Sequence, residues 1–157
     1  MIQRSIALLL FTLLTACSSM GSKNEAADPA VTARDILMQL VWEAKLEEVY
    51  ANATEEFRES VHLSFMAQRL KHTFESAPQD RIIVEGQAPI GNDTKVFASS
   101  ISSADNIYYM LTLREVEGEY RLQNLYLQKR NELKKPENYE PREKPLIVDH
   151  NIGSILR

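Results

Sequence analysis

The stretch IYYMLTL, residues 107–113, decides the fold, because its apolar side chains recur at every second position. A period of two is typical of a β-strand that turns one face towards a core. The residues expected on that buried face are Ile107, Tyr109, Leu111 and Leu113. We therefore predict a half-buried strand here.

A hairpin is expected directly after this strand. Glu117-Gly118 is the kind of pair that forms a tight turn between antiparallel strands. Beyond the turn, the apolar residues are again two positions apart, except for one step of three positions in the middle. They are Tyr120, Leu122, Leu125 and Leu127. This phase shift predicts a β-bulge near Gln123-Asn124.

Two more strands are expected before residue 107. Ile82 and Val84 alternate with their neighbours, and residues 96–102 alternate again with small side chains. Turn signals separate the segments, at Gly91-Asn92-Asp93 and at residues 103–106. The second half of the chain therefore predicts a four-stranded antiparallel meander.

The first half of the chain has the period of helices. Asp28-Pro29 is a good helix start, because Asp caps free N–H groups and Pro suits the first helical position. Apolar residues at spacings of three and four then predict a long helix over residues 29–51. Thr54 is expected to cap a short helix that carries Phe57, and a third helix begins near Ser64. Helices followed by a meander indicate an α+β fold.

The amino terminus has the pattern of an export signal. Arg4 gives a short charged region, and residues 6–14 are apolar apart from Thr12. This run is shorter than the about 20 residues that cross a bilayer, and it has the length of a signal-peptide core. Leu14-Thr15-Ala16-Cys17 follows and resembles the lipobox of bacterial lipoproteins.

This resemblance implies a lipid anchor on Cys17. In that family the signal peptide, here residues 1–16, is removed, and acyl chains on the cysteine bind the membrane without a spanning helix. Ser18 in place of Asp implies export to the outer membrane, so we expect a lipid-anchored protein that faces the periplasm. The alternatives are an ordinary signal peptide with a chance cysteine, or an uncleaved anchor.

Composition limits the function further. The chain has 18 basic and 22 acidic residues, and a mildly acidic chain without a basic stripe argues against nucleic acid as a partner. Lipidation of its single cysteine would exclude disulfides, cysteine-based zinc sites and thiol catalysis. We interpret residues 17–28 as a lipidated cysteine and flexible tether, 29–128 as the domain, and 129–157 as a charged, proline-containing and poorly folded tail.

Over residues 29–128 the chain resembles the nuclear-transport-factor-2-like, or cystatin-like, α+β superfamily. The resemblance lies in residues 42–44 with Tyr50, in residues 54–58, and in the strand pair 108–113 and 118–122. It implies a cone, in which a curved sheet wraps around the long first helix and often leaves an apolar pocket at its mouth. Members include isomerases and dehydratases as well as transport, assembly and cell-envelope modules, so fold does not fix function.

Catalytic residues are hard to find in this pattern. An enzyme of this fold needs an acid or base aimed into the cone, and the strand-region acids lie near strand ends. They are Glu85, Glu115 and Glu117. His62 and His72 are ten residues apart, close to opposite sides of a helix, which does not make a two-ligand metal face. The serines at 99–103 lie in no Gly-x-Ser-x-Gly elbow. We therefore expect no enzyme, cofactor or metal site.

Two surfaces are candidates for binding. Tyr108, Met110 and Tyr126 lie on predicted strands, and some of them must face away from the main core, so they form a possible pocket or partner face. Leu146-Ile147-Val148 is an apolar segment of the tail that is suited to adding as a strand to a sheet edge, its own or a partner's. The alternative is that this segment covers an apolar patch on its own domain.

These observations favour a membrane-tethered, non-enzymatic binding or assembly module with a protein partner in the cell envelope. The alternatives are a small isomerase-like or hydrolase-like enzyme that uses the cone pocket, and a carrier of an apolar ligand. A histidine or carboxylate inside the cone beside a tyrosine would favour the enzyme. An open apolar pocket would favour the carrier.

Overall fold

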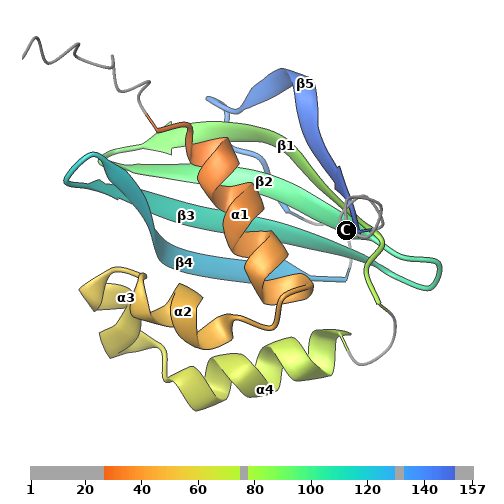
Figure 1. Ribbon diagram of the computed structural model, residues 1–157. Coiled ribbons are helices and arrows are strands. Elements are labelled where there is room, and N and C mark those ends of the chain that lie inside the picture. Colours follow the sequence, from red (N-terminus) through yellow and green to blue (C-terminus); the bar gives the residue numbers. More distant parts are fainter. Residues whose placement is uncertain (1–26, 75–77, 130–132, 151–157) are drawn as a thin grey trace, which may run out of the picture.

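The computed structural model describes residues 27–74, 78–129 and 133–150. These residues form an α+β fold in which one helical layer lies against one sheet (Figure 1). The helices come first and are α1 (Pro29–Val41), α2 (Leu46–Ala51), α3 (Glu55–Ser60) and α4 (Leu63–Phe74). The strands follow and are β1 (Arg81–Ile90), β2 (Asp93–Ile101), β3 (Asn106–Val116), β4 (Glu119–Gln128) and β5 (Glu140–Asp149).

The predicted strand over residues 107–113 is confirmed as the middle of β3. The sheet is antiparallel in the order β4-β3-β2-β1-β5. The four side chains predicted to be buried are each no more than 1% exposed. α1 lies across this face of the sheet, and its fully buried Ala33 and Leu37 belong to the same core cluster (Figure 1).

Both tight hairpins occur where the sequence predicts them. Gly91-Asn92 joins β1 to β2, and Glu117-Gly118 joins β3 to β4. Glu117 and Gly118 both have positive φ, 55° and 84°. That backbone matches the right-handed twist of the strands it connects.

The predicted β-bulge is confirmed in β4. Leu113 pairs with Leu122, but the preceding Thr112 pairs with Asn124, so Gln123 is the extra residue. The insertion turns Leu122 and Leu125 to the same side of the sheet, because side chains otherwise alternate strictly. The bulge therefore keeps both halves of β4 facing the helices.

The prediction of one long helix over residues 29–51 is wrong, because this segment forms two helices, α1 and α2, with a break between them. Trp42 ends α1: its indole N–H donates to the carbonyl of Gln79 at 2.7 Å, and its ring lies 5.1 Å from the ring of His150. Ala44 then adopts a φ of 53°, which an α-helix does not contain. Tertiary contacts at Trp42 thus override a sequence of good helix formers.

The short helix α3 is capped as predicted. The Thr54 side chain accepts a hydrogen bond from the N–H of Phe57 at 3.2 Å, and Phe57 is 2% exposed. The Tyr50 hydroxyl lies 2.9 Å from the carbonyl of Arg58 and 2.8 Å from that of Val61. These contacts from α2 fix the turn that leads into α4.

The sheet has five strands, one more than the predicted four-stranded meander. The additional strand is β5, which forms in the middle of the tail, so the prediction of a poorly folded tail is wrong there. β5 pairs antiparallel with β1. The chain approaches Gly86 closely: a Cβ there would lie 2.4 Å from the carbonyl oxygen of Glu140 and 2.5 Å from the Tyr139 hydroxyl. Tyr139 also packs edge-on against Phe97, with ring centroids 5.2 Å apart. The entry to β5 is therefore packed on the sheet face turned away from the helices.

Ion pairs and a backbone hydrogen bond hold both ends of β5. Arg142 lies 3.1 Å from Asp28, whose side chain also caps α1. At the other end Asp149 forms an ion pair with Arg81, and the N–H of His150 donates to the carbonyl of Asp80 at 2.9 Å. The start of α1 and the start of β5 are thus fixed together.

The sheet is open, with β4 and β5 as its two edges, and it does not wrap around one long helix as the cone would (Figure 1). No helix in the described ranges has the length and apolar character needed to cross a membrane. The expected lipidation site Cys17 and the expected signal peptide lie outside the described residues.

Candidate functional site

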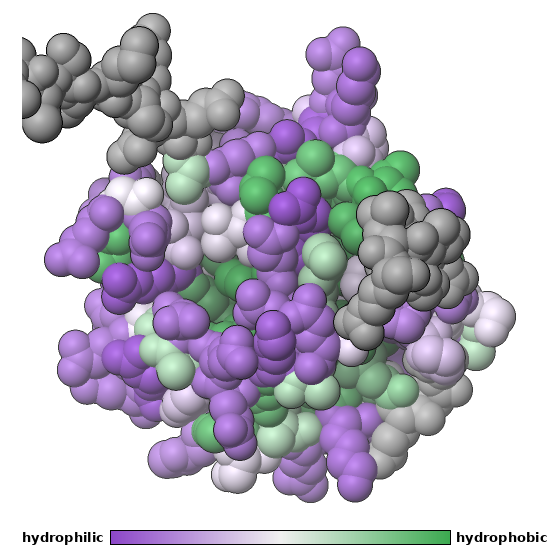
Figure 2. Space-filling model, in the orientation of Figure 1, coloured by the Kyte–Doolittle hydropathy of each residue, from purple (hydrophilic) through white to green (hydrophobic). Residues whose placement is uncertain are grey.

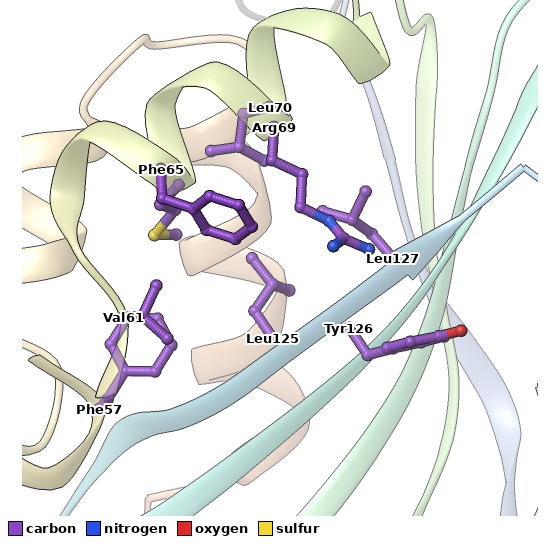
Figure 3. A pocket seen from close by; sticks show the side chains of 9 residues that line it. Phe57, Val61, Phe65, Arg69, Leu70, Leu125, Tyr126 and Leu127 are labelled. Carbon is purple, nitrogen blue, oxygen red and sulfur yellow. The ribbon is translucent and has the colours of Figure 1, made fainter. Parts of the chain in front are cut away.

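An apolar hollow lies between α4 and β4 (Figure 3). α4 begins one residue before its predicted start, and Met66 and Leu70 on one of its faces are buried. Phe65 lies off that buried stripe, is 58% exposed and forms the outer wall. Leu125 and Leu127, which the bulge turns towards the helices, line the β4 side. The cavity volume is about 140 Å³.

A second hollow continues towards the carboxyl end of α4. It shares Phe65, Arg69 and Leu127 with the first and extends to His72 and Lys129, with a volume of about 530 Å³. Figure 3 shows that Phe65 and Arg69 project from α4 towards β4. We call the two adjoining hollows the α4–β4 groove.

The polar end of the α4–β4 groove contains Arg69, His72 and Lys129. Within the described ranges, the guanidinium of Arg69 has no ion pair or hydrogen bond to a side chain. Lys129 lies 3.0 Å from Asp105, and His72 is exposed. No carboxylate of the described residues lines either hollow. The positive charge of Arg69, on a chain of net charge −4, favours an anionic ligand group.

The outer edge of β4 borders the groove and is open over half its length. Towards the start of the strand, the N–H of Thr54 donates to the carbonyl of Leu122 at 2.9 Å, and its hydroxyl donates to Gln123 at 2.6 Å. Residues 124–128 pair with β3 on one side and with no other described strand on the other. Backbone groups at such an edge are a template for another strand.

The opposite edge of the sheet is protected against pairing. β5 contains Pro141 and Pro145, and all the other residues in its first half are charged. They are Glu140, Arg142, Glu143 and Lys144. Proline and charge are the usual means of blocking an edge strand. Residues 124–128, with the sequence NLYLQ, have neither. The two edges therefore differ, and β4 is the one available for pairing.

The residues predicted as a pocket or partner face come together, and one of them, Tyr126, also lines the first hollow of the groove. Met110 pairs with Tyr126 across β3 and β4, and Tyr108 lies on the same face two positions along β3. This face is turned away from the helices, and Tyr126 is 44% exposed. Tyr126 lines the first hollow between Leu125 and Leu127, but Figure 3 shows its ring directed away from that hollow.

The predicted interaction segment of the tail adds as a strand to the edge of its own sheet. Leu146 pairs with Val84 and packs against the core, whereas Ile147 points to the opposite face and is 54% exposed. Val148 pairs with the buried Ile82. Figure 2 shows hydrophobic side chains gathered beside β5 on a face that is otherwise largely hydrophilic. β5 and β4 are opposite edges, so the two predicted surfaces are not brought together.

A polar cluster under α1 is a feature of the core. The Ser100 hydroxyl donates to Gln79 at 2.7 Å and lies 2.7 Å from the Tyr109 hydroxyl. Because Ser100 has one proton to donate, Tyr109 is the donor in the second bond. Burial raises the pKa of Tyr109, while the hydrogen bond with Ser100 opposes that shift. All three residues are no more than 3% exposed, so the cluster offers no surface to a substrate.

The other titratable candidates lie apart from one another. His62 and His72 are exposed, His150 lies against Trp42, and Glu85 pairs with Lys135 at 2.9 Å. In the part of the chain that the structure describes, no three His, Cys, Asp or Glu side chains are grouped so as to hold a metal ion.

Sequence reasoning did not identify Phe65 and Arg69 as site residues. The available signal was the position of Phe65, a large apolar side chain next to the Met66 and Leu70 stripe and not on it. Leu125 and Leu127 were identified as strand residues, but their place beside α4 depends on the fold.

Comparisons with known proteins place this chain in no family. No family model matches it, and neither a curated protein nor a solved structure does. Function is therefore inferred from the contacts, burial and charge of the described residues.

Proposed function

We propose that the chain is a lipid-anchored cell-envelope protein whose domain binds a protein partner without catalysing a reaction. The observation that supports this most strongly is the α4–β4 groove beside an unpaired strand edge. A groove with an exposed aromatic wall, apolar leucines and a charged end is the kind of site that binds a partner segment.

The anchor in this proposal is an acylated Cys17, and its support is the Leu-Thr-Ala-Cys motif in the sequence. If residues 17–28 form the flexible tether predicted from the sequence, its mean end-to-end distance would be about 20 Å. The domain would therefore stay close to the membrane surface, with Asp28 held by Arg142 at the tether's end. A partner in the outer membrane or the adjoining periplasm is within reach.

A carrier of a small apolar ligand is the second candidate. It is favoured by the apolar lining of the first hollow, where Phe57, Leu70 and Leu125 surround a volume of about 140 Å³. That volume is small compared with the about 300–1,000 Å³ of typical ligand pockets, and the adjoining hollow of about 530 Å³ contains Arg69, His72 and Lys129 and is less suited to an apolar ligand. The open strand edge has no use in this alternative, so we prefer the protein partner.

Site-specific photo-crosslinking in intact cells tests the proposal. A photoreactive amino acid replaces Phe65 in the groove or, as the control, Lys144 on the protected edge; both side chains are exposed. We expect a discrete protein adduct from position 65 and not from position 144. Substituting Arg69→Glu in the same chain should reduce the adduct. Equal adducts from both positions, or none from position 65, would contradict the proposal.

The anchor is tested separately. Cys17→Ala should abolish labelling of the chain with radioactive palmitate and release it from the membrane fraction. Labelling or membrane association that persists in Cys17→Ala would show that the lipobox interpretation is wrong, whatever the groove binds.

A further inference from the structure

The free part of the β4 edge has the length of a short peptide. Residues 124–128 span about 17 Å at the usual rise of a strand. Thr54 occupies the edge on one side of this segment, so an added strand is limited to the second half of β4. The groove runs beside this same half, because Leu125 and Leu127 line it.

A strand added at this edge would have two different faces. Its side chains would alternate, as those of β4 do. One set would enter the groove between Phe65 of α4 and the leucines of β4. The other set would lie beside Tyr126 on the open face of the sheet. A large aliphatic residue at every second position fits the first set, and the second set is less constrained.

The charge at the groove defines the polar part of the ligand. The Arg69 guanidinium lies over the groove beside Leu127 (Figure 3) and pairs with no side chain among the described residues. His72 and Lys129 follow at the same end. A carboxylate there would gain a charge-assisted hydrogen bond from Arg69. In a symmetric pair of chains, a second copy would instead bring another Arg69 to this groove, which argues against self-association through it.

From these three observations we infer that the partner is bound as an extended segment that adds to β4 as a sixth strand. Its alternate aliphatic side chains fill the α4–β4 groove, and an Asp or Glu pairs with Arg69. Backbone hydrogen bonds to residues 124–128 supply affinity, and the groove supplies specificity. This inference depends on the proposed function, because it specifies the partner that the same groove binds.

A random dodecapeptide library displayed on phage, selected against the purified full chain, provides the probe. We expect enriched peptides with aliphatic residues at every second position and an acidic residue near one end. In a synthetic copy of one such peptide, each backbone amide is then N-methylated in turn. An added strand bonds to its neighbour through every second residue, so the loss of affinity should alternate with a period of two.

Variants of the protein locate the site. Arg69→Glu should weaken binding of the acidic peptide about tenfold or more, the effect of losing a charge-assisted hydrogen bond. Lys144→Glu, an equal change of charge at an exposed position on the other edge, should leave the dissociation constant within about twofold. Phe65→Asp should abolish binding. Each variant should have the melting temperature of the wild type, because substitutions of exposed side chains usually change stability little.

The outcomes separate the inference from the proposed function. Peptides that require Phe65 but show no period of two, or a helical period, would overturn the extended segment and leave the groove as a protein-binding site. If no peptide is enriched but a fluorescent dodecanoic acid binds in a Phe65-dependent manner, the ligand is a small amphiphile and the inference is wrong. Binding that is insensitive to Phe65→Asp, or no binding of either probe, would overturn both.

Discussion

Removing the Ser100 hydroxyl is expected to destabilise the domain more than removing the Tyr109 hydroxyl, although both break the same buried cluster. Ser100 donates to Gln79 and accepts from Tyr109, each at 2.7 Å. Ser100→Ala therefore leaves a buried acceptor on Gln79 and a buried donor on Tyr109 without this partner. Tyr109→Phe leaves the Ser100–Gln79 bond in place.

The magnitudes follow from the burial of the cluster. Ser100→Ala leaves the buried Tyr109 donor without its acceptor, which costs about 1–3 kcal/mol, and removes the hydrogen bond to Gln79, worth about 1 kcal/mol, so the free energy of unfolding should fall by about 2–4 kcal/mol. Tyr109→Phe removes one neutral hydrogen bond, worth about 1 kcal/mol, and keeps the ring in the core. In the double variant the Tyr109 donor is gone, so its destabilisation should be close to that of Ser100→Ala alone.

Urea unfolding of the four proteins at neutral pH, followed by circular dichroism, measures this double-mutant cycle. We expect a coupling free energy of about 1 kcal/mol or more between the two substitutions. If the two effects add within about 0.5 kcal/mol, or if Tyr109→Phe is the more destabilising, the proton arrangement assigned to the cluster is wrong.

Two further predictions concern the same core and the fifth strand. Burial raises the pKa of Tyr109, so the unfolded chain loses this proton first as the pH rises above about 10. The wild type should then lose up to about 1.4 kcal/mol of stability per pH unit more than Tyr109→Phe, and parallel stability curves would contradict this. Gly86→Ala places a Cβ against Glu140 and Tyr139, so it should destabilise the domain by about 1–3 kcal/mol and open β5 to trypsin at the Arg142–Glu143 bond. Gly118→Ala strains the backbone at a φ of 84°, but its Cβ meets no atom within 4 Å and lies far from β5 in the sheet order, so it should leave β5 resistant. Equal cleavage in both variants would refute the role of Gly86.

The sheet was predictable where one face of a strand is buried and the other is not. β3 alternates cleanly because Ile107 and Leu111 face the core while Tyr108 and Met110 do not. The bulge at Gln123 was predictable for the same reason, since a change of phase in the apolar pattern needs an inserted residue.

β5 was not predicted because it is an edge strand with few buried residues. Leu146 and Val148 face the core, but the prolines and charges of the same strand are those of a disordered segment. The break between α1 and α2 was missed because it depends on Trp42 meeting Gln79 and His150, which are distant in sequence.

The candidate site could be predicted only in part. The sequence predicts that some of Tyr108, Met110 and Tyr126 face away from the core, and in the structure all three share the face turned away from the helices. The α4–β4 groove arises because α4 lies beside β4, and no local pattern specifies that contact. Arg69 acquires its significance only there, because a single arginine on a helix is otherwise an ordinary surface residue.

Residue-resolved amide hydrogen exchange over residues 124–128 tests the availability of the β4 edge most directly. In the isolated chain we expect every second amide of this segment, those not bonded to β3, to exchange rapidly. Addition of a peptide selected on the groove should protect these same amides and leave β5 unchanged. Amides that are already protected in the free chain, or that exchange as fast when the peptide is bound, would contradict the proposed docking on β4.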